Sequence, residues 1–176
     1  EDAVRGGCTH VILSDEATGP DRAAIPMILA TGAVHSHLVR QQLRTFTSIN
    51  VRSGECLDVQ YFAVLIGVGA TTVNAYLTQE AIADRHGRGL FEDLTLEDCL
   101  ANYKRAIQDG LLKIMSKMGI SVLSSYRGGY NFEAVGLSRS LVARFFPGMP
   151  SRISGLGLNG IQSKTLSMHK KAFDEA

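Results

Sequence analysis

Short β-prone runs alternate with helical stretches through most of this chain, and this order restricts the fold more than any other feature. Runs rich in Val, Ile, Thr and Phe predict strands, and apolar residues at helical spacing between them predict helices. A strand that is followed by a helix and a second strand returns by a right-handed crossover, so the two strands lie parallel. The sequence predicts strands at residues 9–14, 45–51, 70–77 and 120–126, and helices at 25–42, 58–66 and 95–119. For residues 70–77, a helical C-terminal part is the alternative.

The helix predicted at residues 95–119 has the clearest boundaries. Thr95 is followed three residues later by Asp98, which is the pattern of a helix N-cap. Gly119 ends the apolar periodicity, and glycine takes the left-handed conformation of a helix C-terminus without a steric penalty. A polar loop is expected at residues 84–89, and short helices are expected after residue 129. The predicted fold class is therefore α/β, with parallel β/α units and extra helices at the C-terminus.

The first three strands and their loops resemble the closing part of a flavin-dependent β/α barrel. Such barrels place glycines after two successive strands, with an arginine after the second, to hold the flavin phosphate. In this chain Gly54 is followed by Glu55, and Asn74 and Ala75 take the place of the Gly-Arg pair. A carboxylate repels a phosphate, and the arginine that would neutralise it is missing. We therefore expect a degenerate (β/α) barrel that has lost its phosphate site.

Charge and cysteine content exclude several classes of protein. The chain has 18 Lys and Arg against 17 Asp and Glu, and no basic block of the kind that binds nucleic acid. Its apolar runs are too short to span a membrane. Cys8, Cys56 and Cys99 are far apart, which predicts reduced thiols in a cytoplasmic protein, with neither a disulfide framework nor an iron–sulfur site. The chain begins Glu-Asp-Ala without an initiator Met or a signal-peptide pattern, so it is interpreted as an internal segment of a longer polypeptide.

No residue pattern indicates catalysis or metal binding. His35 and His37 are two residues apart and would point to different faces of a helix, whereas helical metal ligands are three or four apart. His10 lies in an apolar strand and is interpreted as a partly buried structural histidine. Each cysteine is interpreted as a small buried hydrophobe. We therefore expect no catalytic, cofactor-binding or metal-binding residue in this chain.

Several segments resemble the large subunit of glutamate synthase. The longest is the run Lys-Ile-Met-Ser-Lys-Met-Gly-Ile-Ser at residues 113–121. On this resemblance the chain corresponds to the C-terminal half of the central domain and the connection to the FMN-binding domain. Residues 1–126 would form the barrel-like segment, and residues 127–176 a helical and loop connector. Further segments that resemble the family lie at residues 25–35, 52–55, 65–70, 102–103 and 131–137.

The resemblance implies a parent enzyme that converts glutamine and 2-oxoglutarate into two glutamates. In that family an N-terminal cysteine hydrolyses glutamine, ammonia travels internally, and FMN and a 3Fe-4S cluster supply electrons. The implied partners are the flanking amidotransferase and FMN domains, with a small electron-transfer subunit or ferredoxin. This segment would link the glutaminase and FMN sites without catalysing either reaction. The alternative is a free-standing β/α-barrel-type fragment that binds an anionic metabolite or FMN, and self-association of the excised segment is also expected.

The loop after the predicted fourth strand is the candidate contact with a neighbouring domain. Tyr126 and Arg127 would project from the carboxyl end of that strand, which is the functional face of barrel-like folds. Tyr and Arg are enriched at protein interfaces. A plain solvent-exposed loop remains the alternative interpretation. The candidate interdomain contacts are Lys117, Tyr126, Arg127 and Tyr130.

Overall fold

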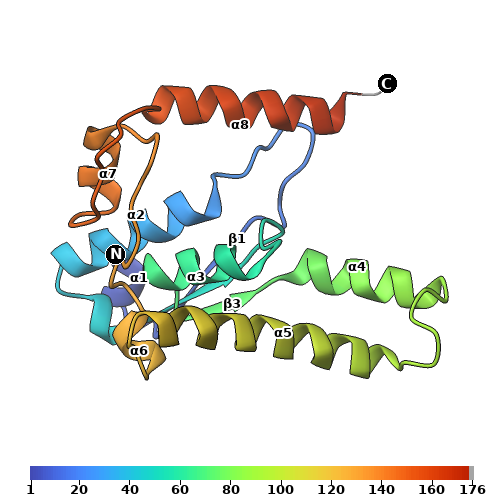
Figure 1. The fold of residues 1–176 in the computed structure, drawn as a ribbon. Helices are drawn as coiled ribbons and strands as arrows, with labels where there is room; N and C mark the ends of the chain where they lie inside the picture. The colour runs from blue at the N-terminus through green and yellow to red at the C-terminus, as the bar shows by residue number, and fades with distance from the viewer. Residues whose placement is uncertain (175–176) are drawn as a thin grey trace.

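The computed structural model describes residues 1–174 and shows an α/β fold built on a three-stranded parallel sheet (Figure 1). The strands β1 (His10–Ser14), β2 (Ser48–Arg52) and β3 (Thr72–Asn74) lie in the order β1-β2-β3. Helix α2 (Met27–Arg40) connects β1 to β2, and α3 (Val59–Gly67) connects β2 to β3. The predicted α/β class with parallel β/α units is therefore confirmed.

One face of the sheet is apolar and packs against α2 and α3. Ile49 and Val51 alternate along β2 and are both buried, with Ile49 against Leu38 of α2 and Val51 among the residues around Leu65 of α3. This alternation is the two-residue period of a strand with one covered face. The apolar face of the sheet therefore forms the main core of the domain.

The opposite face of the sheet is polar and open. Thr72 Oγ1 donates to Asn50 Oδ1 at 2.7 Å, and Asn50 Nδ2 donates to Ser48 Oγ at 3.1 Å. His10 Nδ1 lies 2.7 Å from the same Ser48 hydroxyl. His10 is exposed on this face, so its interpretation as a partly buried histidine is wrong. Parallel sheets are usually covered on both faces, and residues 1–174 cover only one face of this sheet.

Helices α4 (Tyr76–Gly87) and α5 (Leu96–Lys117) pack against each other and form a second layer with α3 (Figure 1). The predicted capping box at Thr95 and Asp98 is present, with both reciprocal hydrogen bonds. Gly110 allows α5 to approach α3, because a Cβ at this position would lie 2.6 Å from Val59 Cγ1. The loop predicted at residues 84–89 is wrong over most of its length, since α4 continues to Gly87. Its polar sequence reflects the exposure of this helix, which has no buried residue.

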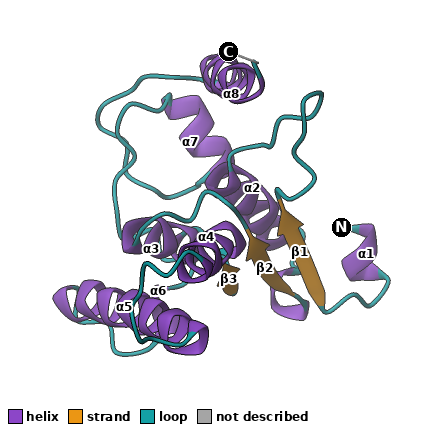
Figure 2. Cartoon of the chain, turned by 90° about the vertical axis from the view of Figure 1, so that its right-hand side faces the viewer, coloured by secondary structure: helices purple, strands orange, loops and turns teal. Residues whose placement is uncertain are grey.

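Four short helices and the C-terminal helix α8 complete the fold. Figure 2 shows α7 and α8 stacked beyond α2, on the side away from α5. Ser36 Oγ donates to Phe145 O at 2.8 Å and ties α7 to α2, and His169 Nε2 of α8 lies 2.8 Å from Gly19 O. The extra C-terminal helices are therefore confirmed. The short elements are α1 (Asp2–Arg5), the 3-10 helix η1 (Arg44–Phe46), α6 (Leu123–Tyr126) and α7 (Arg139–Phe145), and the last helix is α8 (Leu158–Phe173).

The fourth strand predicted at residues 120–126 is wrong. The segment turns at Gly119, which has the expected left-handed backbone (φ +70°), and then forms the single turn of α6. Gly128 N donates to Ile66 O at 3.1 Å, so the loop after α6 is tied to the end of α3. The third predicted strand is also shorter than residues 70–77, because Tyr76 already begins α4. Among residues 1–174, no helix has both the length and the apolar character that crossing a bilayer requires.

Candidate functional site

The carboxyl edge of the sheet is where barrel-like folds usually hold ligands, and here it is occupied by carboxylates. Asp15 follows β1, and its Oδ2 accepts hydrogen bonds from Ser53 Oγ at 2.6 Å and from Gly54 N at 3.0 Å. Ser53 is fully buried. The glycine loop after β2 therefore directs its donors to a side chain of the protein itself.

Glu55 is the second carboxylate, after Asp15, that accepts hydrogen bonds at this edge. Its Oε2 accepts from Met27 N at 2.9 Å and from the Tyr61 hydroxyl. Met27 is the first residue of α2, whose N-cap residue Pro26 provides no side-chain cap. The free N–H groups and the dipole at a helix N-terminus favour a negative charge. Glu55 thus supplies from another loop the carboxylate that caps α2.

These contacts decide whether the edge fits a flavin phosphate. A phosphate would need the Gly54 N–H and the N-terminus of α2 as donors, and Asp15 and Glu55 already accept from both. Two carboxylates would also repel the phosphate oxygens. The residues present do not fit the group, which agrees with the expected loss of the phosphate site.

The buried thiol at this edge is unsuited to nucleophilic chemistry. Cys56 is completely buried, and burial raises the pKa of its thiol to about 12, with the nearby Asp15 and Glu55 carboxylates adding to the shift. The thiolate is the reactive form of cysteine, so a high pKa suppresses reactivity. The interpretation as a buried hydrophobe is confirmed for Cys56 and Cys99, whereas Cys8 is half-buried. Among the described residues, no three His, Cys, Asp or Glu side chains are grouped closely enough to hold a metal ion.

The structure changes the position of the predicted contact loop. Tyr126 does not project, because its ring is 1% exposed and packs against Ala63, Ile66 and Met115. Arg127 lines a pocket together with His10 and Ser48, which begin β1 and β2. The loop therefore lies at the amino edge of the sheet, and its expected position at the carboxyl edge is wrong. The expectation was based on a fourth strand at residues 120–126 that ends at this loop, and the structure has no strand there.

The other three candidate contact residues remain accessible to different degrees. Lys117 and Arg127 are exposed, and Tyr130 is half-buried against the core around Val68. Tyr130 has a left-handed backbone (φ +48°), and its ring meets His35 edge-on with 6.5 Å between centroids. Their contact with a neighbouring domain stays a prediction.

Three exposed apolar side chains lie close to Lys117 in the sequence, at the end of α5 and in the segment that follows. Met118 is 43% exposed, Val122 is 52% exposed and Leu123 is 41% exposed. A monomeric surface seldom groups large apolar side chains without an interaction to cover them. We name the set Met118, Val122 and Leu123 the α5-end patch.

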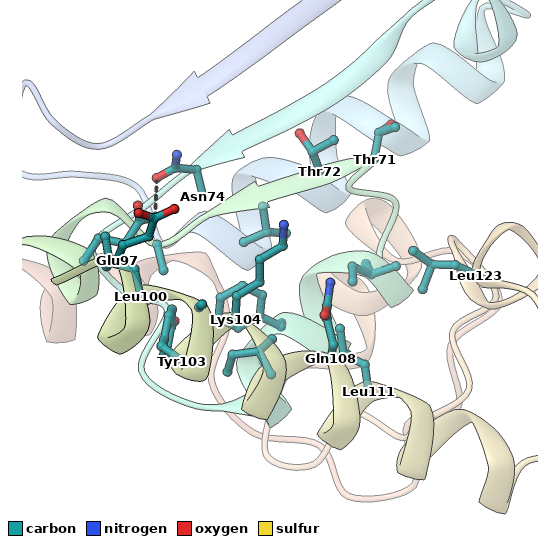
Figure 3. Close-up of a pocket in the computed structure, with 17 residues that line it drawn as sticks. Thr71, Thr72, Asn74, Glu97, Leu100, Tyr103, Lys104, Gln108, Leu111 and Leu123 are labelled. Carbon is teal, nitrogen blue, oxygen red and sulfur yellow. Dashed lines mark hydrogen bonds between the residues drawn. The ribbon is translucent and has the colours of Figure 1, made fainter. Parts of the chain in front are cut away.

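An apolar groove runs beside the free edge of β3. Figure 3 shows Lys104 and Gln108 of α5 extending towards β3, with Leu100, Tyr103 and Leu111 of the same helix beside them in the lining. The groove holds about 600 Å³ and shows no cluster of reactive groups. Its composition is that of a packing surface along a strand edge.

His35 and Arg44 are the functional candidates that the sequence did not indicate. Arg44 Nε donates to His35 Nδ1 at 3.1 Å, so this ring nitrogen is unprotonated. Burial, Arg44 and Arg127 together lower the pKa of His35 from 6.5 to about 4. The two residues are nine positions apart on different elements, and no local motif signals their contact.

The low pKa of His35 predicts acid destabilisation. As pH falls from 6.5 to 4, the unfolded chain binds a proton at this residue and the folded chain does not, so the free energy of unfolding decreases. Because the ring is only partly buried, solvent screening reduces this effect, and the expected total loss is about 1–2 kcal/mol. Urea denaturation across this pH range should give a smaller slope for His35→Gln than for the wild type. His86→Gln, in helix α4, which has no buried residue, serves as the control, and an equal change of slope in this variant would contradict the assignment to His35.

Comparison with known proteins adds the family context. The model of the glutamate synthase central domain matches residues 1–138. The glutamate synthase [NADPH] large chain of Azospirillum brasilense is 75% identical over 99% of this chain, and that of Bacillus subtilis is 40% identical over 99%. The ferredoxin-dependent glutamate synthase of Spinacia oleracea is 41% identical, also over 99%. The chain spans 12%, 11% and 12% of the lengths of these three relatives.

Proposed function

This chain belongs to the glutamate synthase central-domain family, and on that basis we propose that it is a non-catalytic domain that links glutaminase and FMN sites within one polypeptide. The proposed parent reaction is the reductive conversion of glutamine and 2-oxoglutarate into two glutamates. FMN and a 3Fe-4S cluster would belong to other parts of that polypeptide. A small electron-transfer subunit or ferredoxin would deliver the electrons.

The observation that supports the non-catalytic role is that side chains of the protein itself accept the hydrogen bonds of the donors at the carboxyl edge. Asp15 and Glu55 accept the hydrogen bonds that a phosphate or carboxylate ligand would need there. A free-standing barrel fragment that binds FMN or an anionic metabolite at this edge would have to displace both. The donor pattern thus favours a structural domain over that alternative.

The incomplete layers of the sheet support a domain that packs within a larger protein. Within residues 1–174, the outer edges of β1 and β3 have no strand partner. Ile12 of β1 is 67% exposed on the open face. Unpaired edges and uncovered faces of parallel sheets are normally covered by further structure. The neighbouring domains of the parent polypeptide are the proposed cover.

The α5-end patch offers the most direct test of the linking role. Val122→Asp places a charge in the patch, where an interface would have to bury it without a partner. Val122 is also the N-cap residue of α6, a position where Asp is favoured, so the fold should be retained. We expect docking of the neighbouring domain to weaken roughly tenfold, equivalent to about 1.4 kcal/mol. In the full-length enzyme, more glutamine should then be hydrolysed for each glutamate formed by reduction.

The control carries the same change at an exposed apolar residue away from this patch. Leu90 follows α4 and is 58% exposed, so Leu90→Asp introduces an equal charge there. It should leave the ratio of glutamine hydrolysis to glutamate formation at the wild-type value. An unchanged ratio in the Val122→Asp enzyme would contradict the proposed contact.

A further inference from the structure

A second pocket lies at the amino edge of the sheet, and its charge is opposite to that of the carboxyl edge. The cavity holds about 560 Å³ and lies between the starts of β1 and β2, η1 and the loop after α6. Arg44 and Arg127 line it together with His10, and Thr71 and Ser124 add hydroxyl groups. No Asp or Glu is among its lining residues.

The Arg44 guanidinium is held firmly by neutral acceptors. Its Nη1 donates to Thr47 O at 2.6 Å, and its Nη2 donates to Gly69 O at 2.8 Å and to Thr71 Oγ1 at 3.2 Å. With the Nε bond to His35, four of its five N–H groups have acceptors. These bonds fix the orientation of the guanidinium, and none of them compensates its charge.

Arg127 adds a second positive charge to the same cavity. Within residues 1–174, its side chain forms no hydrogen bond and no ion pair. Its proximity disfavours the charged form of Arg44, whose pKa is lowered by burial and by Arg127. An anion between the two guanidinium groups would offset their repulsion, which acts most strongly on the half-buried Arg44.

We propose that this pocket binds an oxyanion, a carboxylate or phosphate group, between Arg44 and Arg127. Among the described residues, the Arg127 guanidinium has no hydrogen-bond partner and can form paired, charge-assisted hydrogen bonds with either anion, whereas Arg44 has one N–H group left to donate. The Thr71 and Ser124 hydroxyls add neutral donors. The oxyanion is either a small free anion or an acidic side chain from another part of the parent polypeptide. The inference rests on the pocket alone and does not depend on the linking role.

Inorganic phosphate is the probe, and hydrogen–deuterium exchange of the full-length protein is the measurement. Peptides that cover residues 44–48, 69–72 and 124–128 are compared in phosphate and in chloride at equal ionic strength, because simple screening is then the same. At about ten times the dissociation constant, exchange through local opening should slow roughly tenfold in these peptides.

Variants of Arg127 separate binding from structure. Arg127→Gln removes the charge from a side chain without structural partners and should abolish the phosphate effect. Arg127→Lys keeps a charge and should restore part of it, which a purely structural role would not predict. Arg105→Gln, on the exposed face of α5, is the matched control and should behave as wild type.

Each outcome decides the inference. Slower exchange in phosphate that is lost only in Arg127→Gln identifies a free anion as the ligand. If these peptides already exchange slowly in chloride, and exchange faster in Arg127→Gln, the ligand is an acidic side chain of the same polypeptide. Exchange that is the same in wild type and Arg127→Gln under both conditions overturns the proposal.

Discussion

Gly69→Ala is expected to lower the free energy of unfolding by roughly 3–4 kcal/mol. Gly69 follows α3 with φ +122°, a backbone conformation that residues with a Cβ rarely adopt. A Cβ at this position would lie 2.4 Å from His35 Cγ and 2.8 Å from His35 Cβ. The imidazole has little freedom to move, because its Nδ1 accepts from Arg44. Backbone strain and steric overlap therefore add at this residue.

Gly119→Ala separates the two contributions. Gly119 also has a positive φ, but a Cβ there would meet no atom within 4 Å. Gly119→Ala should therefore lower the free energy of unfolding through backbone strain alone, by about 1–2 kcal/mol. Urea denaturation at an unchanged m-value gives both free energies. Equal losses for the two alanine variants would show that the His35 overlap is relieved at little cost.

The sequence predicted those parts of the fold that local patterns specify. The Thr95–Asp98 capping box lies within one turn of helix, and Gly119 marks the helix end through its own backbone preference. The failure at residues 120–126 has a tertiary cause. The β-prone residues Ile120 to Val122 are followed by Tyr126, whose burial against Met115 and Ile66 turns the segment towards α3. Packing with residues distant in the sequence overrides a propensity of this size.

The same distinction applies to the sites. The repulsion of a phosphate at the carboxyl edge could be predicted from the sequence, because the carboxylate residue Glu55 directly follows Gly54. Its role as the cap of α2 could not, because Met27 is 28 residues away. The basic pocket was missed for the same reason, since Arg44, Gly69 and Arg127 meet only after the sheet forms. Sites built from several distant loops give no periodic or motif-like signal.

Asp15→Ala is expected to lower the free energy of unfolding by roughly 3–4 kcal/mol. The carboxylate accepts from the Ser53 hydroxyl, which is completely buried, and from the Gly54 N–H. Both donors lose their acceptor in the alanine variant, and a buried donor without a partner costs about 1–3 kcal/mol. The effect reaches beyond β1, because Ser53 and Gly54 form the loop that directs Glu55 to α2.

Glu16→Ala provides the matched comparison, one residue further along the chain. Glu16 pairs with Arg52 at 2.7 Å, but both side chains are at least 40% exposed. An exposed ion pair contributes at most about 1 kcal/mol, so this variant should remain close to wild type in urea denaturation. Asp15→Asn keeps one acceptor oxygen and should fall between the two. A loss for Asp15→Ala no larger than that for Glu16→Ala would mean that water replaces the carboxylate, and that the carboxyl edge is open enough to admit a ligand after all.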